Sequence, residues 1–448
     1  MPHCLYAAER QRTLAVLMST AETTPDRVHP ARHRWRPVLL ILAALLVGAV
    51  LLLTGGSPIG RALPAPTADQ VGAARAAAMQ LRVLRTTPGA SGTVRFSAMD
   101  LRAISTLASH GFAPDRLDAY LADGALRIDA AHKLPLGRWL NVALAVRSQP
   151  KGFPSIRMTV GHVPLGEGMT RFVIRTARWL LAKREVPVPP LDTLVRSFTV
   201  VPGGVAADIT LSPSMIEGLT RLDGHRIDPA QVAQIYCTLG RLQRSAPLGD
   251  VAAQVRRAFA LQPPATATAE RNRATFVALA MFLVDPSAGE MAGNARERID
   301  ACRAPVPVVT LHGRADLTMH WSLSAALTAG SSTQIAQAMG TWKELADSLS
   351  KQSEFAVGDP TGFSFLDLSA DRSGFRIATV AVEPSEAVRI ATALSRVTED
   401  QILPPALMAQ QDGLTNQQFV RHFGGIADPR YDAAVGRIDA VLDAAGIK

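Results

Sequence analysis

The chain has 448 residues, which exceeds one ordinary domain and indicates two or three. Hydrophobic residues make up 48% of it, enough for packed cores, and the formal net charge is +9. The basic residues form no run with interleaved aromatic residues, so we expect no nucleic-acid partner. A basic surface near a membrane could instead contact anionic lipid headgroups.

Residues 37–56 carry the strongest single pattern. Pro37 to Leu53 is uncharged and apolar, and the uncharged stretch continues to Gly56. About 20 such residues cross a bilayer core as a helix. We therefore predict a transmembrane anchor in inner-membrane lipid. The alternative is a cleaved signal peptide, for which the following "RALPAPTA" would offer a small-residue cleavage site.

Arginines set the expected orientation of this anchor. Arg32, Arg34 and Arg36 precede it, and nothing comparable follows it. The positive-inside rule then makes residues 1–36 a cytoplasmic basic tail and exports the rest. We predict a single-pass protein of the bacterial inner membrane with its bulk in the periplasm.

Cysteine usage agrees with this topology. Cys4 falls on the cytoplasmic side, whereas Cys237 and Cys302 form an even pair on the exported side. An oxidising compartment favours a disulfide between them. Two buried free thiols are the alternative.

A stalk and a small α+β domain are expected next. Residues 57–92 are rich in Pro, Ala and Gly and are interpreted as a stalk or linker. Residues 93–212 mix helical spacing, with Ser97 as a helix N-cap, and strand-like alternation. We predict an antiparallel sheet covered by helices, including one strand at 154–165 and a hairpin turned at Pro202-Gly203-Gly204. The sheet could cradle a lipid or a chain-like ligand.

Residues 213–448 are predicted to form an all-α helical bundle domain. Asp228 followed by Pro229 indicates a helix start, and residues 269–285 are apolar nearly all round, as in a buried central helix. In "HFGGIADPRY", residues 422–431, Gly424 is expected to end one helix and Asp428 to begin the next. The alternative gives His422 or Arg430 a role in closing a polar site. The fold class is therefore α+β, with a single N-terminal transmembrane helix, a small antiparallel-sheet domain and an all-α bundle.

Three segments of this bundle place polar residues on one helix face, because three- and four-residue spacings bring side chains together. The spaced groups are Asp316 with His320 and Ser324, Glu344 with Asp347, and Asp367 with Asp371, which Arg372 follows directly. We name as catalytic candidates His320, Asp316, Glu344, Asp347 and Asp371, and as binding candidates Ser324, Asp367 and Arg372.

Burying such groups unpaired costs several kcal/mol each, so they must pair, bind a cation or face water. One interpretation is a network of ion pairs, such as Asp371 with Arg314 or Glu344 with Lys343. A second is a divalent metal site between facing helices. A third is an acid–base site in which Asp316 or Asp347 orients His320.

The order of these residues also resembles a known family. Residues 312–376 contain Asp316-x-x-x-His320-Trp321-x-x-Ser324-x-x-Leu327, Lys343-Glu344-x-x-Asp347 and Phe363-Ser364-x-x-Asp367-Leu368-x-Ala370-Asp371-x-x-Gly374. This pattern resembles the YfiM-like envelope lipoproteins, which are similar to the wider VanZ-like group linked to glycopeptide resistance. The resemblance implies that the polar positions act as one unit. Leu317 stands where a lysine often follows the aspartate in that family.

Two functions follow as hypotheses. The first is a membrane-anchored periplasmic cell-envelope protein of the binding or organising type, acting on a lipid, a glycan or an envelope protein. The second is an envelope hydrolase or transferase with a carboxylate and histidine site, metal-assisted or not. An enzyme requires a pocket at the polar residues and a strongly shifted pKa, whereas a binding protein would pair them with one another.

Overall fold

The computed structural model describes residues 35–86, 91–112, 115–184, 186, 188–210, 227–261, 263–330, 333–349, 352–353 and 361–447. The chain divides into two units, Met1–Val50 and Leu51–Lys448. Most of the predicted basic tail at 1–36 and the first part of the predicted bundle, up to residue 226, lie outside the described residues.

The apolar stretch forms helix α1 (Trp35–Leu53), and its large side chains from Leu40 onward are mostly exposed. The helix ends at Leu53, three residues before the predicted end of the anchor at Gly56. Thr54 and Gly55 form strand β1, which pairs with residues Leu140 and Trp139. Nowhere in the part of the chain that the structure describes is a helix both long and apolar enough to cross a membrane.

The segment interpreted as a stalk contains helix α2 (Ala68–Thr86). Val71, Ala73, Ala74 and Ala77 are buried along one side of it. Small alanine side chains allow close packing, and α2 contacts both α3 (Ala98–Gly111) and α12 (Thr333–Asp347). This part of residues 57–92 is therefore packed onto its neighbours.

Antiparallel strands form two sheets, so the α+β class is confirmed. The larger sheet consists, in order of pairing, of β3 (Arg116–Ala122), β4 (Ala125–Lys133), β5 (Trp139–Arg147), β6 (Ser155–Val160) and β7 (Val163–Leu165), with β1 (Thr54–Gly55) beside β5. The smaller sheet consists of β2 (Ser91–Ser97), β9 (Gly204–Thr210) and β8 (Val195–Val201). Their shared core contains Leu101, Leu126, Val146, Phe198 and Val205.

Local signals explain several of these elements. Ser97 caps α3 in a full capping box with Asp100. The β8–β9 hairpin turns at Pro202 and Gly203, where Gly203 has φ +75° and suits a turn that needs a left-handed residue. The single strand predicted at 154–165 is wrong, because the chain turns at Gly161 and returns as β7.

Helix α4 (Glu167–Lys183) packs on β6 and β7, and the short α5 (Leu191–Leu194) precedes β8. The remaining described helices are α7 (Pro229–Ser245), α8 (Val251–Phe259), α9 (Ala269–Leu283), α10 (Ala295–Arg298), α11 (Ala315–Gly330), α12, α13 (Phe365–Ala381), α14 (Ala387–Leu394), α15 (Glu399–Ile402), α16 (Asn416–Phe423) and α17 (Pro429–Ala444). The 3-10 turns are Pro135–Gly137, Pro264–Thr266, Pro286–Ala292, Asp300–Cys302 and Pro405–Leu407.

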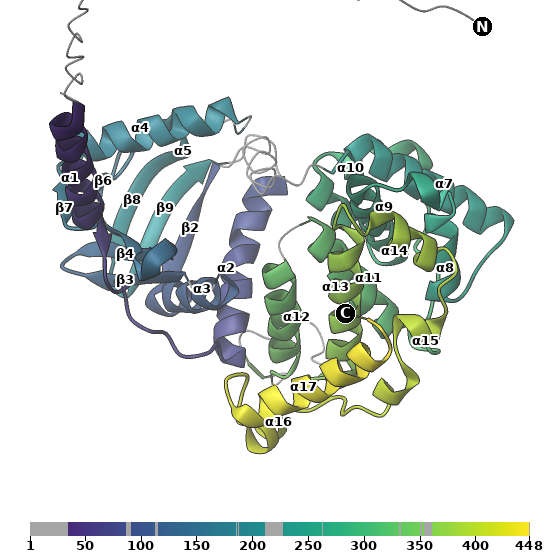
Figure 1. Ribbon diagram of the computed structural model, residues 1–448. Coiled ribbons are helices and arrows are strands. Elements are labelled where there is room, and N and C mark those ends of the chain that lie inside the picture. Colours follow the sequence, from purple (N-terminus) through teal and green to yellow (C-terminus); the bar gives the residue numbers. More distant parts are fainter. Residues whose placement is uncertain are drawn as a thin grey trace, which may run out of the picture. The chain divides into compact units, whose positions relative to one another are not determined.

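The helical region has one large apolar core, which buries α9 on all sides as its sequence predicts. In Figure 1, α9 lies among α7, α11 and α14, which it contacts. A disulfide joins Cys237 of α7 to Cys302, with Cα atoms 5.5 Å apart. Gly424 ends α16 with φ +69°, and the Asp428 side chain caps α17. Arg430 pairs with Asp428.

Candidate functional site

Three helices place the polar residues, and their backbones approach closely because small residues lie where they meet. Helix α11 packs on both α13 and α12. A Cβ atom added at Gly374 of α13 would come within 2.4 Å of the Trp321 carbonyl oxygen of α11. At Gly340 of α12 a Cβ atom would be 3.0 Å from a carboxylate oxygen of Asp371. Glycine at both positions therefore allows the three helices to bring their polar faces together.

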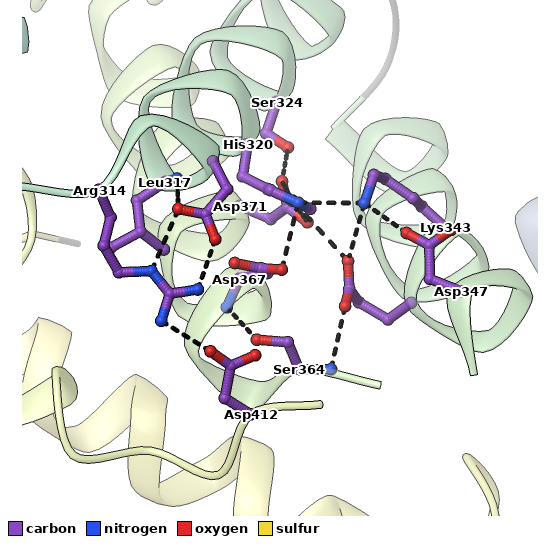
Figure 2. A network of polar contacts seen from close by, with 12 residues as sticks. Arg314, Leu317, His320, Ser324, Lys343, Asp347, Ser364, Asp367, Asp371 and Asp412 are labelled. Carbon is purple, nitrogen blue, oxygen red and sulfur yellow. Dashed lines mark hydrogen bonds and ion pairs between the residues drawn. The ribbon is translucent and has the colours of Figure 1, made fainter. Parts of the chain in front are cut away.

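His320 of α11 and Asp371 of α13 form the centre of the site (Figure 2). The Nδ1 atom of His320 lies 3.2 Å from each carboxylate oxygen of Asp371. Ser324, one turn after His320, donates its hydroxyl to Asp371 Oδ1 at 2.6 Å. The Asp371 carboxylate therefore joins both polar residues of the α11 face.

Helix α12 adds a lysine and two carboxylates from the other side. Lys343 Nζ lies 3.0 Å from His320 Nε2, 2.6 Å from Asp347 Oδ2 and 3.4 Å from Glu344 Oε1. Glu344 Oε1 is also 3.8 Å from His320 Nδ1, and its Oε2 accepts the Ser364 backbone N–H at 3.0 Å. Glu344 thus connects α12 to the start of α13.

Asp367 is the fourth carboxylate of the group. Its Oδ2 atom lies 3.4 Å from His320 Nε2, and its backbone N–H is bound by the Ser364 hydroxyl that caps α13. Its other oxygen, Oδ1, is buried and has no hydrogen-bond partner within the described part of the chain. Figure 2 shows this carboxylate below the imidazole, between Arg314 and Ser364.

We call His320, Lys343, Glu344, Asp347, Asp367 and Asp371 the polar cluster. Glu344 is 0% exposed, His320 3%, Asp371 5% and Asp367 6%. The side chains of Lys343 and Asp347 are 37% and 20% exposed, so the cluster reaches solvent on the α12 side. Four carboxylates thus face one ammonium and one imidazole in a largely buried setting.

This environment shifts several pKa values. Burial raises the pKa of Glu344 to about 8, and burial also raises the pKa of Asp367. Burial alone would lower the pKa of His320, but the charge and hydrogen bond of Asp371 outweigh it and raise the pKa to about 9. For Lys343 too, burial lowers the pKa, and the charges of Glu344 and Asp347 reverse this and raise it.

The contact between Lys343 and His320 constrains where the ring proton lies. An ammonium only donates, so a hydrogen bond to Nε2 requires a neutral ring with its proton on Nδ1, facing Asp371. When the ring takes a second proton, Nε2–H faces Asp367 Oδ2 instead and the ammonium loses that acceptor. The second ring proton and the Lys343 ammonium therefore compete for the Nε2 atom of His320.

Not every predicted residue joins the cluster. Asp316 lies beside it but pairs with Arg314, whose hydrogen bond lowers the pKa of Asp316. Arg314 also binds Asp412 at 2.6 Å, so the expected pair of Arg314 with Asp371 is wrong. Leu317 occupies the position where a lysine often follows the aspartate in the resembling family. Arg314 provides the positive charge beside Asp316 instead. Neither Asp316 nor Asp347 orients His320, since Asp371 occupies that position.

Arg372 points away from the cluster and pairs with Asp439 of α17. It follows Asp371 directly, and consecutive residues of a helix project in different directions. Lys343 was predicted only as an ion-pair partner of Glu344, and not as a member of the site. Its place four residues before Asp347 was the available signal, because that spacing puts it on the same face.

The cluster has the composition of a cation site. One ligand atom each from His320, Glu344 and Asp371 lie within 4.8 Å of one another. Imidazole nitrogen with carboxylate oxygens suits divalent transition metals, and carboxylates and histidines on facing helices are a recurring way to hold them. The unpartnered Asp367 oxygen adds a further acceptor at the same place.

Comparison with known proteins places no relative beside this chain. No family model, no curated protein and no solved structure matches it.

Proposed function

We propose that the protein is a cell-envelope protein of the binding or organising class, and that its polar cluster holds a divalent cation. The observation that carries this proposal is the buried Oδ1 atom of Asp367, which has no hydrogen-bond partner among the described residues. It lies in a group of four carboxylates that faces one lysine and one imidazole. A buried acceptor without a donor costs roughly 1–3 kcal/mol, and more when it is charged. A cation between these oxygens would remove that cost.

Lys343 alone does not neutralise the group. Its ammonium contacts Asp347 and Glu344, which leaves Asp367 and Asp371 to share the imidazole. The side chain is 37% exposed on a flexible stem, so it can turn toward solvent when a divalent ion takes its place beside Glu344. The ion would then lie among the ligand atoms of His320, Glu344 and Asp371.

Mutual pairing favours binding over catalysis. Ser324 and His320 both use Asp371, and Glu344 is occupied by Lys343 and the Ser364 N–H. Residues held in this way fix the arrangement of α11, α12 and α13. A lipid, a glycan or an envelope protein would then be the partner that this rigid body organises.

Two observations support a site of action at an envelope membrane. The apolar residues of α1 are mostly exposed from Leu40 to Leu53, and such a surface is favourable in lipid. The Cys237–Cys302 disulfide suits an oxidising compartment. We keep the arrangement expected from the sequence, a single anchor at 37–56 with a cytoplasmic start and a periplasmic body, as part of the proposal.

An envelope hydrolase or transferase is the second candidate, and the pKa of Glu344 favours it. A carboxyl with a pKa of about 8 exchanges protons near neutral pH, as a general acid or base requires. The exposed edge at Lys343 and Asp347 would be the entry for substrate.

Metal content and thermal melting of the full chain in detergent test the cation site. We expect about one equivalent of zinc or manganese in the wild type after loading, and none in His320→Ala. Chelator should lower the wild-type melting temperature by about 5 °C and leave His320→Ala unchanged, because a bound ion stabilises only the folded state. Asp439→Asn is the matched control, since it breaks the Arg372 pair on α13 and leaves the cluster complete.

Absence of metal from the loaded wild type, together with melting that ignores chelator, would show that the cluster is a self-sufficient polar network. Hydrolysis of a model phosphate ester by the loaded wild type, lost in His320→Ala and kept in Asp439→Asn, would select the hydrolase instead.

A further inference from the structure

Helix α4 has a face that packs and two faces that do not. At about 100° per residue, Thr170, Ile174 and Leu181 point in one direction. Thr170 is buried and donates to the Leu165 carbonyl of β7, and Ile174 and Leu181 are half-buried. The helix contacts β6 and β7. This side holds α4 on the larger sheet.

The second face of α4 is apolar and exposed. It presents four large side chains, each more than half exposed: Met169, Phe172, Trp179 and Leu180. Lys183 lies on the same side, with its ammonium over the Trp179 ring at 5.7 Å. An exposed group of this size usually marks an interaction surface.

The third face carries arginines at positions 171, 175 and 178. Arg171, Arg175 and Arg178 line a cavity of about 190 Å³ together with Phe153, Pro190, Leu191 and Asp192. The Asp192 carboxylate accepts the Phe153 N–H at 3.1 Å. Within the described part of the chain, none of the three guanidinium groups forms an ion pair. Three unpaired positive groups at one cavity are suited to an anionic oxygen ligand such as a phosphate.

The start of α4 lies close to the end of the apolar helix α1. The His162 N–H, in the turn between β6 and β7, donates to the Leu52 carbonyl at 2.8 Å. A Cβ atom at Gly161 would come within 2.4 Å of the same oxygen, so the turn lies directly against this segment. Only β7 and Gly166 separate that turn from the first residue of α4, Glu167.

We propose that α4 binds the surface of an anionic phospholipid bilayer. The exposed face, centred on Phe172 and Trp179, enters the boundary between headgroups and acyl chains, where aromatic side chains are favoured. The three arginines contact lipid phosphates, which matches their charge. A basic helix with large apolar residues beside its charges is typical of interfacial membrane binding. This inference is independent of the proposed cation site. It rests on the proposed function in one respect, which is that the protein lies at an envelope membrane.

Fluorescence quenching of Trp179 tests this inference in the full chain. The protein is reconstituted in vesicles of phosphatidylcholine with or without phosphatidylglycerol, containing lipids labelled with a quencher at a shallow position. The signal of Trp179 is the difference between the wild type and Trp179→Phe. Flotation of the vesicles at high salt reports separately whether residues 37–56 hold the chain on the membrane.

We expect shallow quencher to remove about half of the Trp179 signal in vesicles with phosphatidylglycerol and much less without it. A variant with Arg171, Arg175 and Arg178 all changed to Gln should lose this difference. The matched control changes Arg241, Arg421 and Arg437 to Gln, which removes the same charge from exposed positions outside α4, and it should behave as the wild type.

A chain that floats with vesicles while its Trp179 signal ignores lipid quencher overturns the inference and leaves the anchor intact. Trp179 shielded from both lipid and aqueous quenchers also overturns it, since a protein partner would then cover α4. Quenching that does not depend on lipid charge or on the three arginines overturns their assigned role. A chain that does not float contradicts the anchor, whereas its Trp179 signal still decides the role of α4.

Discussion

The Nε2 atom of His320 lies 3.0 Å from the ammonium nitrogen of Lys343, while the Nδ1 atom of the same ring faces Asp371. One imidazole therefore separates a cation from an anion inside a buried cluster. Its protonation depends on both, because Asp371 stabilises the charged ring and Lys343 opposes it. The protonation state of His320 therefore affects its contacts with both α12 and α13.

Replacing Lys343 should change the titration of His320 directly. In Lys343→Met the opposing positive charge is gone, and we expect the pKa of His320 to rise above its wild-type value of about 9. NMR titration of the histidine ring protons measures this shift. Lys343→Arg is the control, since it keeps the charge and should leave the pKa nearly unchanged. A lower pKa in Lys343→Met would contradict the assigned role of the lysine.

The stability of the metal-free protein should fall as pH rises through neutrality. The folded-state pKa values of His320 and Glu344, about 9 and about 8, lie above the ordinary values of 6.5 and 4.5. The folded chain then holds protons that the unfolded chain releases, so the His320 contribution is complete below pH 6.5 and lost as pH rises through about 9. For Glu344 the loss ends near pH 8.

Chemical unfolding between pH 6 and pH 9.5, with chelator present, measures this effect. We expect a decrease on the order of 5 kcal/mol in the free energy of unfolding, because each pKa unit over this range corresponds to about 1.4 kcal/mol. Glu344→Gln imitates the protonated carboxyl and should flatten the lower part of the curve. A stability that increases over this range would show that the cluster ionises in the opposite sense.

The close approach of α11 and α13 at Gly374 should be required for the stability of the site. In Gly374→Ala the new Cβ atom would meet the Trp321 carbonyl at 2.4 Å, so α11 and α13 must move apart. We expect a loss of about 3 kcal/mol in the free energy of unfolding. Gly436→Ala on α17 is the matched control, because its Cβ atom meets nothing within 4 Å and should stabilise that helix by about 0.5–1 kcal/mol. Equal effects at the two positions would refute the close approach.

Local sequence patterns predicted elements whose cause is itself local. Ser97, Asp228 and Gly424 mark helix ends because each acts on backbone groups a few residues away. The predicted strand at 154–165 was wrong for a related reason. A turn at Gly161 needs only one residue with φ +58°, and alternation of apolar residues continues on both sides of it.

The polar cluster shows which contacts such local patterns do not predict. The spacing of Asp316, His320 and Ser324 placed them on one helix face, and α11 has that face. Spacing cannot reveal that Arg314 pairs with both Asp316 and Asp412, or that Arg372 pairs with Asp439. These choices depend on α17 and on the segment around Asp412, which lie far along the chain.

The sequence by itself determined the α+β class, the apolar N-terminal stretch, the buried helix α9 and the candidate faces of α11, α12 and α13. Each of these follows from the periodicity or composition of one segment. Only the tertiary structure decided which polar residues meet, because Asp371 and Lys343 reach His320 through close packing at Gly374 and Gly340. Such packing sums weak contacts between distant segments, and no single segment contains that information.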